Sequence, residues 1–180
     1  MQNKSFFLEL VETFVVSFIV LTVLYGLIAF PEIVSGASME PGIADADRIL
    51  VEKISRIFTG FDRGDLVVLH PPDNDNIDYV KRIIGIPGDV VKISDCEVFI
   101  TRDGNRFVLE EPYLYENTCT SGGKYFQEGK AQKIEEGYYL VLGDNRDRSA
   151  DSRVFGPIAQ ERIVGKAVFR FWPPSKLGFL

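Results

Sequence analysis

Residues 13–30, TFVVSFIVLTVLYGLIAF, form a run without a single charged side chain. As a helix, this run would span about 27 Å, close to the hydrocarbon thickness of a bilayer. Glu9 and Glu12 lie just before the run, and Pro31 ends it. A buried core helix would need helical partners, and the sequence shows no other long helical pattern. The run therefore predicts one transmembrane helix.

A cleaved signal peptide is the alternative reading of this segment. The small residues Ser35 and Ala37 resemble a processing site. However, the uncharged run is longer than the roughly 7 to 15 residues of a signal-peptide core. Cleavage there would also separate Ser38 from the chain before it. The segment is therefore predicted to be a retained membrane anchor.

The charges on either side of the run predict its orientation. Lys4 and the amino terminus precede it, whereas four acidic residues follow it before the first cation, Arg48. Because Lys and Arg are enriched in cytoplasmic flanks, this favours a cytoplasmic N-terminus in the cell membrane. The expected organisation is a short cytoplasmic segment at 1–12, a single transmembrane helix at 13–30 and an extracytoplasmic β-rich domain at 31–180.

Beyond residue 48 the pattern is typical of strands. Short runs rich in Val, Ile, Phe and Tyr, such as RILVEKI, GDLVVLH, YVKRIIGI and GYYLVLGD, alternate with turn sequences such as PGD and DGN. Residues 71–78 and 115–132 are expected to be loops. Several short strands at this spacing predict a mainly β fold, with an antiparallel β domain after the one N-terminal transmembrane helix.

The composition limits the chemistry that this domain can carry. A zinc site of several histidines is excluded because His70 is the only histidine, and Cys96 and Cys119 are too few and too far apart for a metal motif. No metal or other cofactor is expected. The net charge is -6 without a run of Lys and Arg, so nucleic acid is not an expected partner. The two cysteines would pair in an oxidising compartment and stay free in a reducing one.

Ser38, in SGASMEP at residues 35–41, follows the predicted membrane helix closely. A serine hydroxyl is a weak nucleophile and needs a base that takes its proton. His70 is one candidate, although a histidine at the end of a strand is more often a surface residue. Lys81, in YVKRIIGIPGD, is the other, because burial on an apolar strand face would lower its pKa. A shift from about 10.4 to about 8 corresponds to roughly 3 kcal/mol. The plain alternative is a lysine that reaches solvent from an edge strand.

A third block, GDNRDRSADSRVFGP at residues 143–157, interleaves acidic and basic side chains. It reads either as a rigid polar network that orients a base or as a solvated, charge-balanced loop. Composition alone leaves both readings open. The residues concerned are Asp144, Asp147, Asp151, Arg146, Arg148, Arg153, Ser149 and Ser152.

In order and approximate spacing, these blocks closely resemble those of the type I signal peptidases, membrane-bound serine proteases with a Ser–Lys dyad. The matching segments are SGASMEP, GDLVVLHPP, YVKRIIGIPGD and GDNRDRSADSRVFGPI, and EEPYL and KAVFRFWPPSKLGFL also look familial. The resemblance implies a serine endopeptidase that removes N-terminal signal peptides from translocated preproteins. It assigns Ser38 as the nucleophile and Lys81 as its general base.

The resemblance also implies supporting roles around the dyad. Ser149 would hydrogen-bond the lysine amine and orient it, and Met39 would anchor the serine loop. An ion pair between Arg82 and Asp144 is expected as one support. Gly36 stands where some members carry a serine that stabilises the oxyanion, which leaves that task to backbone N–H groups. The other charged positions implied as supports are Arg146, Asp151 and Arg153.

The expected partners are preproteins, the lipid bilayer and the nearby secretion translocon. A preprotein would add to the sheet as an extended strand, with small residues at the first and third positions before the cut. Val34, Ile43 and Val80 are predicted to line its pockets, unless they are ordinary core. Phe171 and Trp172 would lie at the membrane interface or pack in an aromatic corner.

Two other functions fit part of the sequence. Self-cleaving repressors share the Ser–Lys chemistry and a β-rich fold, but they are soluble and carry a DNA-binding module. A catalytically inactive, membrane-tethered β domain that binds partners would also show one span and several strands. In that case, replacing Ser38 or Lys81 would change only stability.

Overall fold

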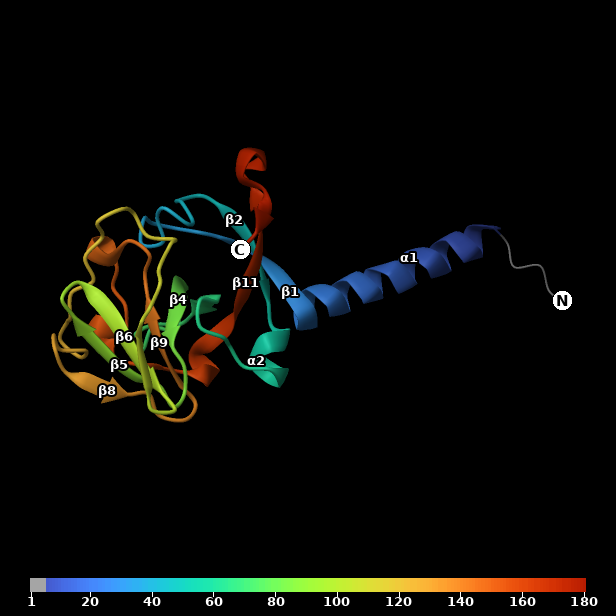
Figure 1. Ribbon diagram of the computed structural model, residues 1–180. Coiled ribbons are helices and arrows are strands. Elements are labelled where there is room, and N and C mark those ends of the chain that lie inside the picture. The colour runs from blue at the N-terminus through green and yellow to red at the C-terminus, as the bar shows by residue number, and fades with distance from the viewer. Residues whose placement is uncertain (1–5) are drawn as a thin grey trace.

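The computed structural model describes residues 6–180, which form one long helix and a β-rich body (Figure 1). Helix α1 (Phe6–Val23) continues as the π-helical turn η1 (Leu24–Ile28). None of the α1 side chains is buried, and the helix projects away from the body. Phe6–Gly26 is long and apolar enough to cross a membrane. Lys4, on which the predicted orientation depends, lies outside the described residues.

The chain leaves the helix two residues before the end of the predicted span. Strand β1 (Ala29–Ile33) includes Ala29 and Phe30, which pair with Glu52 and Val51 of the neighbouring strand. Phe30 also packs against the hydrophobic core. Both residues therefore belong to the β-rich body, because strand pairing satisfies their backbone groups and packing covers the ring.

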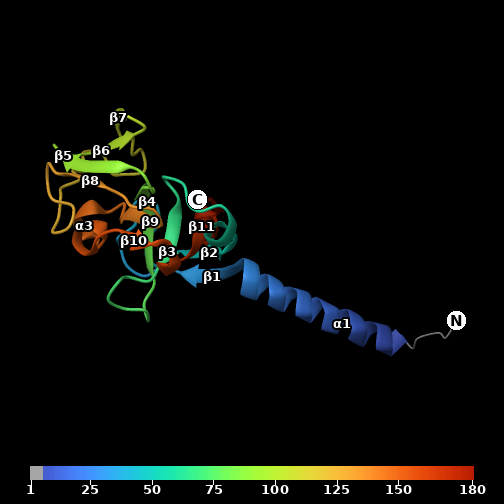
Figure 2. The same ribbon diagram turned by 90° about the horizontal axis from the view of Figure 1, so that it is seen from below.

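Two antiparallel sheets make up the body, which confirms the predicted mainly β fold (Figure 2). Within the described residues, the larger sheet has the order β1-β2-β11-β3-β4-β9-β10, and β12 pairs with β11. The smaller has the order β7-β6-β5-β8. In the larger sheet the strands after β1 are β2 (Arg48–Glu52), β3 (Leu66–Leu69), β4 (Tyr79–Gly85), β9 (Tyr138–Leu142), β10 (Ile158–Ala159), β11 (Ile163–Trp172) and β12 (Gly178–Phe179). Those of the smaller sheet are β5 (Val90–Ser94), β6 (Glu97–Arg102), β7 (Asn105–Val108) and β8 (Ala131–Lys133).

Short helical turns connect these strands. They are α2 (Ile54–Phe58), η2 (Arg146–Arg148), α3 (Ser152–Phe155), η3 (Gln160–Arg162) and η4 (Pro174–Lys176). The central strands β3 and β4 carry almost no polar alternation, because side chains pack on both of their faces. β4 contributes Val80, Ile84 and Ile83 to three different hydrophobic clusters. This strand is therefore held rigidly at the centre of the body.

A disulfide joins Cys96, in the turn between β5 and β6, to Cys119 in the loop after β7. The Cα atoms lie 4.4 Å apart although the residues are 23 apart in sequence. Within the same region, 115–132, Phe126 is buried in a hydrophobic cluster. The loop after β7 is thus fastened to the smaller sheet at two points.

Candidate active site

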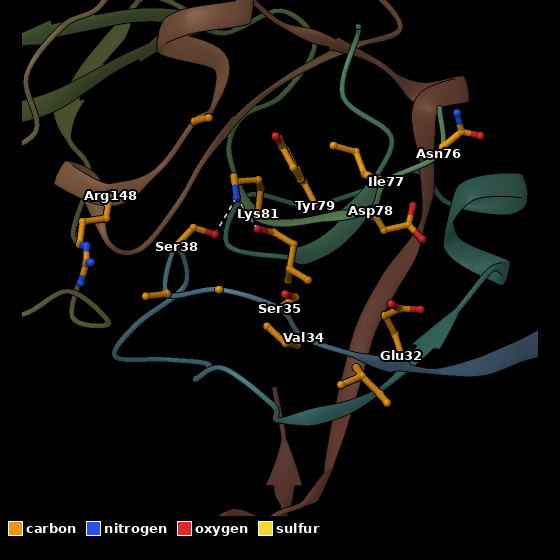
Figure 3. Close-up of a pocket in the computed structure, with 15 residues that line it drawn as sticks. Glu32, Val34, Ser35, Ser38, Asn76, Ile77, Asp78, Tyr79, Lys81 and Arg148 are labelled. Atoms are coloured by element: carbon orange, nitrogen blue, oxygen red, sulfur yellow. Dashed lines mark hydrogen bonds between the residues drawn. The ribbon is translucent and has the colours of Figure 1, made fainter. Parts of the chain in front are cut away.

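Ser38 and Lys81 meet beside the central strand β4 of the larger sheet (Figure 3). Lys81 lies in the middle of β4, and Ser38 lies in the loop between β1 and β2. The distance from Lys81 Nζ to Ser38 Oγ is 2.8 Å, and Nζ also donates to the carbonyl of Val80 at 2.9 Å. The candidate base that contacts the serine is therefore the lysine. His70 Nδ1 instead lies 2.9 Å from Asp78 Oδ1.

The loop that carries Ser38 is fixed from several sides. Gly36 has a φ of +93°, a conformation that favours glycine, and its N–H donates to Asp45 Oδ1 at 2.7 Å. Met39 is 1% exposed and belongs to the core, in agreement with its predicted anchoring role. On the far side, Asn145 N donates to the Ser38 carbonyl at 3.0 Å. The serine therefore has a defined position relative to β4.

Burial makes Lys81 an unusual lysine. Its side chain is 2% exposed, and desolvation lowers its pKa from 10.5 to about 8, against the opposing pull of Asp151 and Asp144. Within residues 6–180, no carboxylate lies at ion-pair distance from Nζ. A measurable fraction of the amine is consequently neutral near pH 7, which is the form that can accept a proton.

A cleft of about 630 Å³ opens beside the dyad. One wall is formed by residues 32–38 and the other by residues 76–81, with Arg148 at one end (Figure 3), and Ala150 also lines the cleft. Val34 and Val80 line this cleft while they also belong to the core. Ile43 is fully buried and does not line it. An extended peptide could lie between the two walls.

The loop at 143–153 is a buried charge network, not a solvated loop. The predicted pair is present: Arg82 Nε and Nη2 donate to the two oxygens of Asp144 at 2.9 and 2.7 Å. Burial raises the pKa of Asp144, and the bonds from Arg82 oppose that rise. Asp151 in turn accepts two bonds from the Arg153 guanidinium at 2.8 Å. Three of these four residues are at most 8% exposed.

Ser149 does not form the expected bond with Lys81. Its Oγ is buried and has no hydrogen-bond partner within the described part of the chain. It packs against Gly143, where an added Cβ would lie 2.2 Å from Ser149 Oγ and 2.5 Å from the Ser38 carbonyl oxygen. Glycine at 143 is therefore what allows this loop and the serine loop to approach each other.

Three residues of the network received no role from the sequence. Glu111 forms an ion pair with Arg146, and the Tyr113 ring covers Arg82. Thr120 accepts a hydrogen bond from Arg146. All three lie on the loop after β7, more than 25 residues from their partners, where no short motif links them. The sequence showed only that EEPYL, which contains Glu111 and Tyr113, resembles a segment of the family.

Comparisons with known proteins show what this chain is similar to. The family model described as "Signal peptidase, peptidase S26" matches residues 7–172. Signal peptidase IB of Staphylococcus aureus (strain MRSA252) is 38% identical over 98% of this chain and 95% of its own length. Signal peptidase I of Bacillus licheniformis is 36% identical over 97% and 94%. The crystal structure of a signal peptidase I from Enterococcus faecalis V583 is 30% identical, covers 60% of this chain and 97% of its own, and aligns with a TM-score of 0.48.

Proposed function

This chain belongs to the signal peptidase family, peptidase S26, and we propose that it removes signal peptides from translocated preproteins, with Ser38 as nucleophile and Lys81 as general base. The observation that carries the assignment is the 2.8 Å contact between Ser38 Oγ and the buried Lys81 amine. A buried amine with a pKa lowered to about 8 is partly neutral at the pH at which a serine must be activated.

The chemistry follows from that contact. Neutral Lys81 takes the hydroxyl proton while Ser38 Oγ attacks the carbonyl carbon of the scissile bond. Backbone N–H groups, including that of Ser38, stabilise the oxyanion of the tetrahedral intermediate. The lysine ammonium then gives its proton to the leaving amine, which is the new N-terminus of the mature protein. Water activated by the same amine hydrolyses the acyl-enzyme.

The charged residues around the dyad support it without reacting. Ser149, whose Oγ has no hydrogen-bond partner, would act by packing against Gly143, where that glycine meets the serine loop. The Arg82–Asp144 and Arg153–Asp151 pairs would hold the 143–153 loop against the serine loop. Arg146, whose Nε donates to the Gly143 carbonyl at 3.1 Å, would fix the same turn.

The cleft would take the signal peptide in an extended conformation. Residues 32–38 and 76–81 would flank it as neighbouring strands, and Val34 and Val80 would form shallow apolar walls for small side chains. Ile43 would not touch the peptide, because it is fully buried in the core with Val34 and Val80.

The anchor gives the site its place in the cell. α1 would cross the cell membrane once, with the N-terminus in the cytoplasm and the β-rich body outside, beside the translocon that delivers preproteins. The Cys96–Cys119 disulfide supports an oxidising compartment for the body.

The test is cleavage of a preprotein with an Ala-x-Ala site by the purified chain in detergent. Wild type is expected to cut after the second alanine, and folded Ser38→Ala and Lys81→Ala to be inactive. His70→Ala should keep kcat within about twofold, because general-base loss costs far more. Circular dichroism checks the fold of each variant. If the Ser38 and Lys81 variants cut like wild type, the dyad is wrong. If wild type cuts none of a set of preproteins in lipid, a tethered binding domain becomes the better interpretation.

A further inference from the structure

We propose that Glu111 and Tyr113, on the loop after β7, are positioning residues for the dyad. They hold the guanidinium groups of Arg82 and Arg146, and through these they fix β4 at Lys81 and the turn that supports Ser38. The inference rests on the proposed function, because it concerns the geometry of the same reaction.

Arg82 is held from three sides. Asp144 binds it through two bonds, the Gly64 carbonyl accepts a bond from Nη1 at 2.9 Å, and the Tyr113 ring centroid lies 3.9 Å from Cζ. The Arg82 side chain is 11% exposed, a setting in which a cation over an aromatic ring is strongly attracted. Because Arg82 directly follows Lys81 in β4, a tilt of its side chain is transmitted to the peptide that carries the base.

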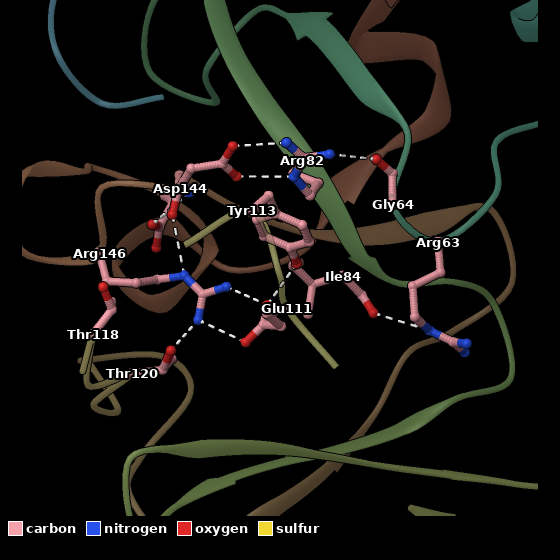
Figure 4. A network of polar contacts seen from close by, with 12 residues as sticks. Arg63, Gly64, Arg82, Ile84, Glu111, Tyr113, Thr118, Thr120, Asp144 and Arg146 are labelled. Atoms are coloured by element: carbon pink, nitrogen blue, oxygen red, sulfur yellow. Dashed lines mark hydrogen bonds and ion pairs between the residues drawn. The ribbon is translucent and has the colours of Figure 1, made fainter. Parts of the chain in front are cut away.

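Glu111 connects this arginine to a second one (Figure 4). The Tyr113 hydroxyl donates to Glu111 Oε1 at 2.6 Å. Arg146 donates to both oxygens of the same carboxylate, with 3.1 Å from Nη1 to Oε2. The Arg146 side chain is 1% exposed and that of Glu111 is 9% exposed. An unmatched guanidinium at this depth would be costly, so the carboxylate fixes where Arg146 can lie.

From Arg146, two contacts lead to the nucleophile. Arg146 Nε donates to the Gly143 carbonyl, and the neighbouring Asn145 N donates to the Ser38 carbonyl. Gly143 itself lies so close to Ser38 that it has no room for a Cβ. A shift of Arg146 would therefore move the turn on which the serine loop rests.

The network pairs three arginines with three carboxylates. Its arginines and acids are Arg82, Arg146, Arg153, Glu111, Asp144 and Asp151. The loop that supplies Glu111 and Tyr113 is itself anchored, because Thr120 N donates to the Cys96 carbonyl at 3.1 Å next to the disulfide. The smaller sheet thus reaches the dyad through this loop.

The experiment measures kcat and KM of the full chain in detergent with an Ala-x-Ala preprotein, well below the melting temperature of each variant. Glu111→Gln removes the charge and keeps the shape, Tyr113→Leu removes the ring, and Tyr113→Phe keeps the ring over Arg82. Glu110→Gln and Tyr115→Leu are matched controls, since both residues are exposed on the same loop.

The expected result is a kcat loss of about 10- to 100-fold for Glu111→Gln and Tyr113→Leu, with KM within about twofold, because a displacement of about 1 Å in a reacting group costs this much. Tyr113→Phe should recover most of the loss, and both controls should match wild type. The inference is overturned if folded Glu111→Gln and Tyr113→Leu keep the wild-type kcat while only their melting temperature falls, or if KM alone rises. Should Tyr113→Leu fail to fold, the near-isosteric Glu111→Gln decides in the same way.

The two proposals fail in different ways. If Ser38→Ala and Lys81→Ala still cut, the proposed function is wrong. If those variants are inactive and Glu111→Gln is fully active, only the positioning role is wrong.

Discussion

Two neighbouring regions of the site bury cations in opposite ways. On the internal strand β4, Lys81 is 2% exposed, and within the described residues its Nζ hydrogen-bonds only a hydroxyl and a carbonyl. In the 143–153 network, each buried guanidinium meets a carboxylate, as Arg82 meets Asp144 through two bonds. Lys81 and Arg82 are consecutive, so a single strand supplies both environments.

The difference shows what decides whether a buried cation keeps its charge. The charge of the Arg82 guanidinium is compensated by Asp144 through two bonds. Lys81 has no such partner in contact, so desolvation lowers its pKa to about 8. Arginine therefore organises the site, and lysine is the residue that can exchange a proton.

Lys81→Arg tests whether the cation beside Ser38 must be able to lose its proton. It keeps the charge on β4 but removes a group that can be neutral, so kcat should fall by about 10⁴-fold or more, as when a member of a catalytic unit is lost. The measurement is preprotein cleavage by the folded variant. Lys92→Arg, on a partly buried position of β5, is the control and should match wild type. Retention of more than a tenth of the wild-type rate would show that Lys81 is not the base.

Asp144→Asn tests the ion pair between Arg82 and Asp144. It leaves the guanidinium of Arg82 buried without its counter-charge, so the free energy of unfolding should fall by about 3 to 5 kcal/mol. Urea denaturation in detergent measures it, with the 90% exposed side chain of Asp103 as the control in Asp103→Asn. The double variant Arg82→Met with Asp144→Leu should be more stable than Asp144→Asn. An unchanged midpoint for Asp144→Asn would mean that the pair contributes nothing.

The pH dependence of stability tests the uncompensated cation, Lys81. The folded pKa of Lys81 is about 8 and the ordinary value is 10.5, so between these pH values the unfolded chain binds more protons than the folded one. Stability should therefore rise with pH across this window, by about 3 kcal/mol relative to Lys81→Met. Below pH 8 both states are protonated and the difference is constant.

The same titration should appear in catalysis. Below pH 7, kcat/KM should rise about tenfold per pH unit, then less steeply through pH 8, and it should level off above pH 8, because only the neutral amine accepts the serine proton. A flat profile across this range, or a stability difference that does not change between pH 8 and 10.5, would contradict the lowered pKa.

The sequence predicted the parts whose signals are local. The uncharged run predicted the helix, although the structure assigns Ala29 and Phe30 to β1, because their pairing with β2 is a contact that hydropathy does not reveal. The alternating runs of Val, Ile, Phe and Tyr predicted the mainly β fold. The motif blocks predicted the Arg82–Asp144 pair, and they named Ser38 and Lys81, which the structure brings within 2.8 Å.

The sequence did not predict the contacts for which the motif blocks name no partner. Ser149 Oγ has no hydrogen-bond partner, and the Lys81 amine donates to Ser38 and Val80. Glu111 and Tyr113 lie in the EEPYL segment, which resembles the family but does not indicate what these side chains contact. Their partners, Arg146 and Arg82, are 35 and 31 residues away in the sequence, and only the fold brings them together.

By itself, the sequence determined the family, the apolar helix, the β-rich body and the residues able to act as nucleophile and base, because chemical type and hydrophobic periodicity are written in single residues and short runs. Tertiary structure decided which of these side chains lose water and which find a counter-charge. Burial on β4 lowers the pKa of Lys81, the disulfide pairs two cysteines that composition left open, and the loop after β7 completes the charge balance. Desolvation and ion pairing depend on what surrounds a group in space, so they could not be predicted from the sequence alone.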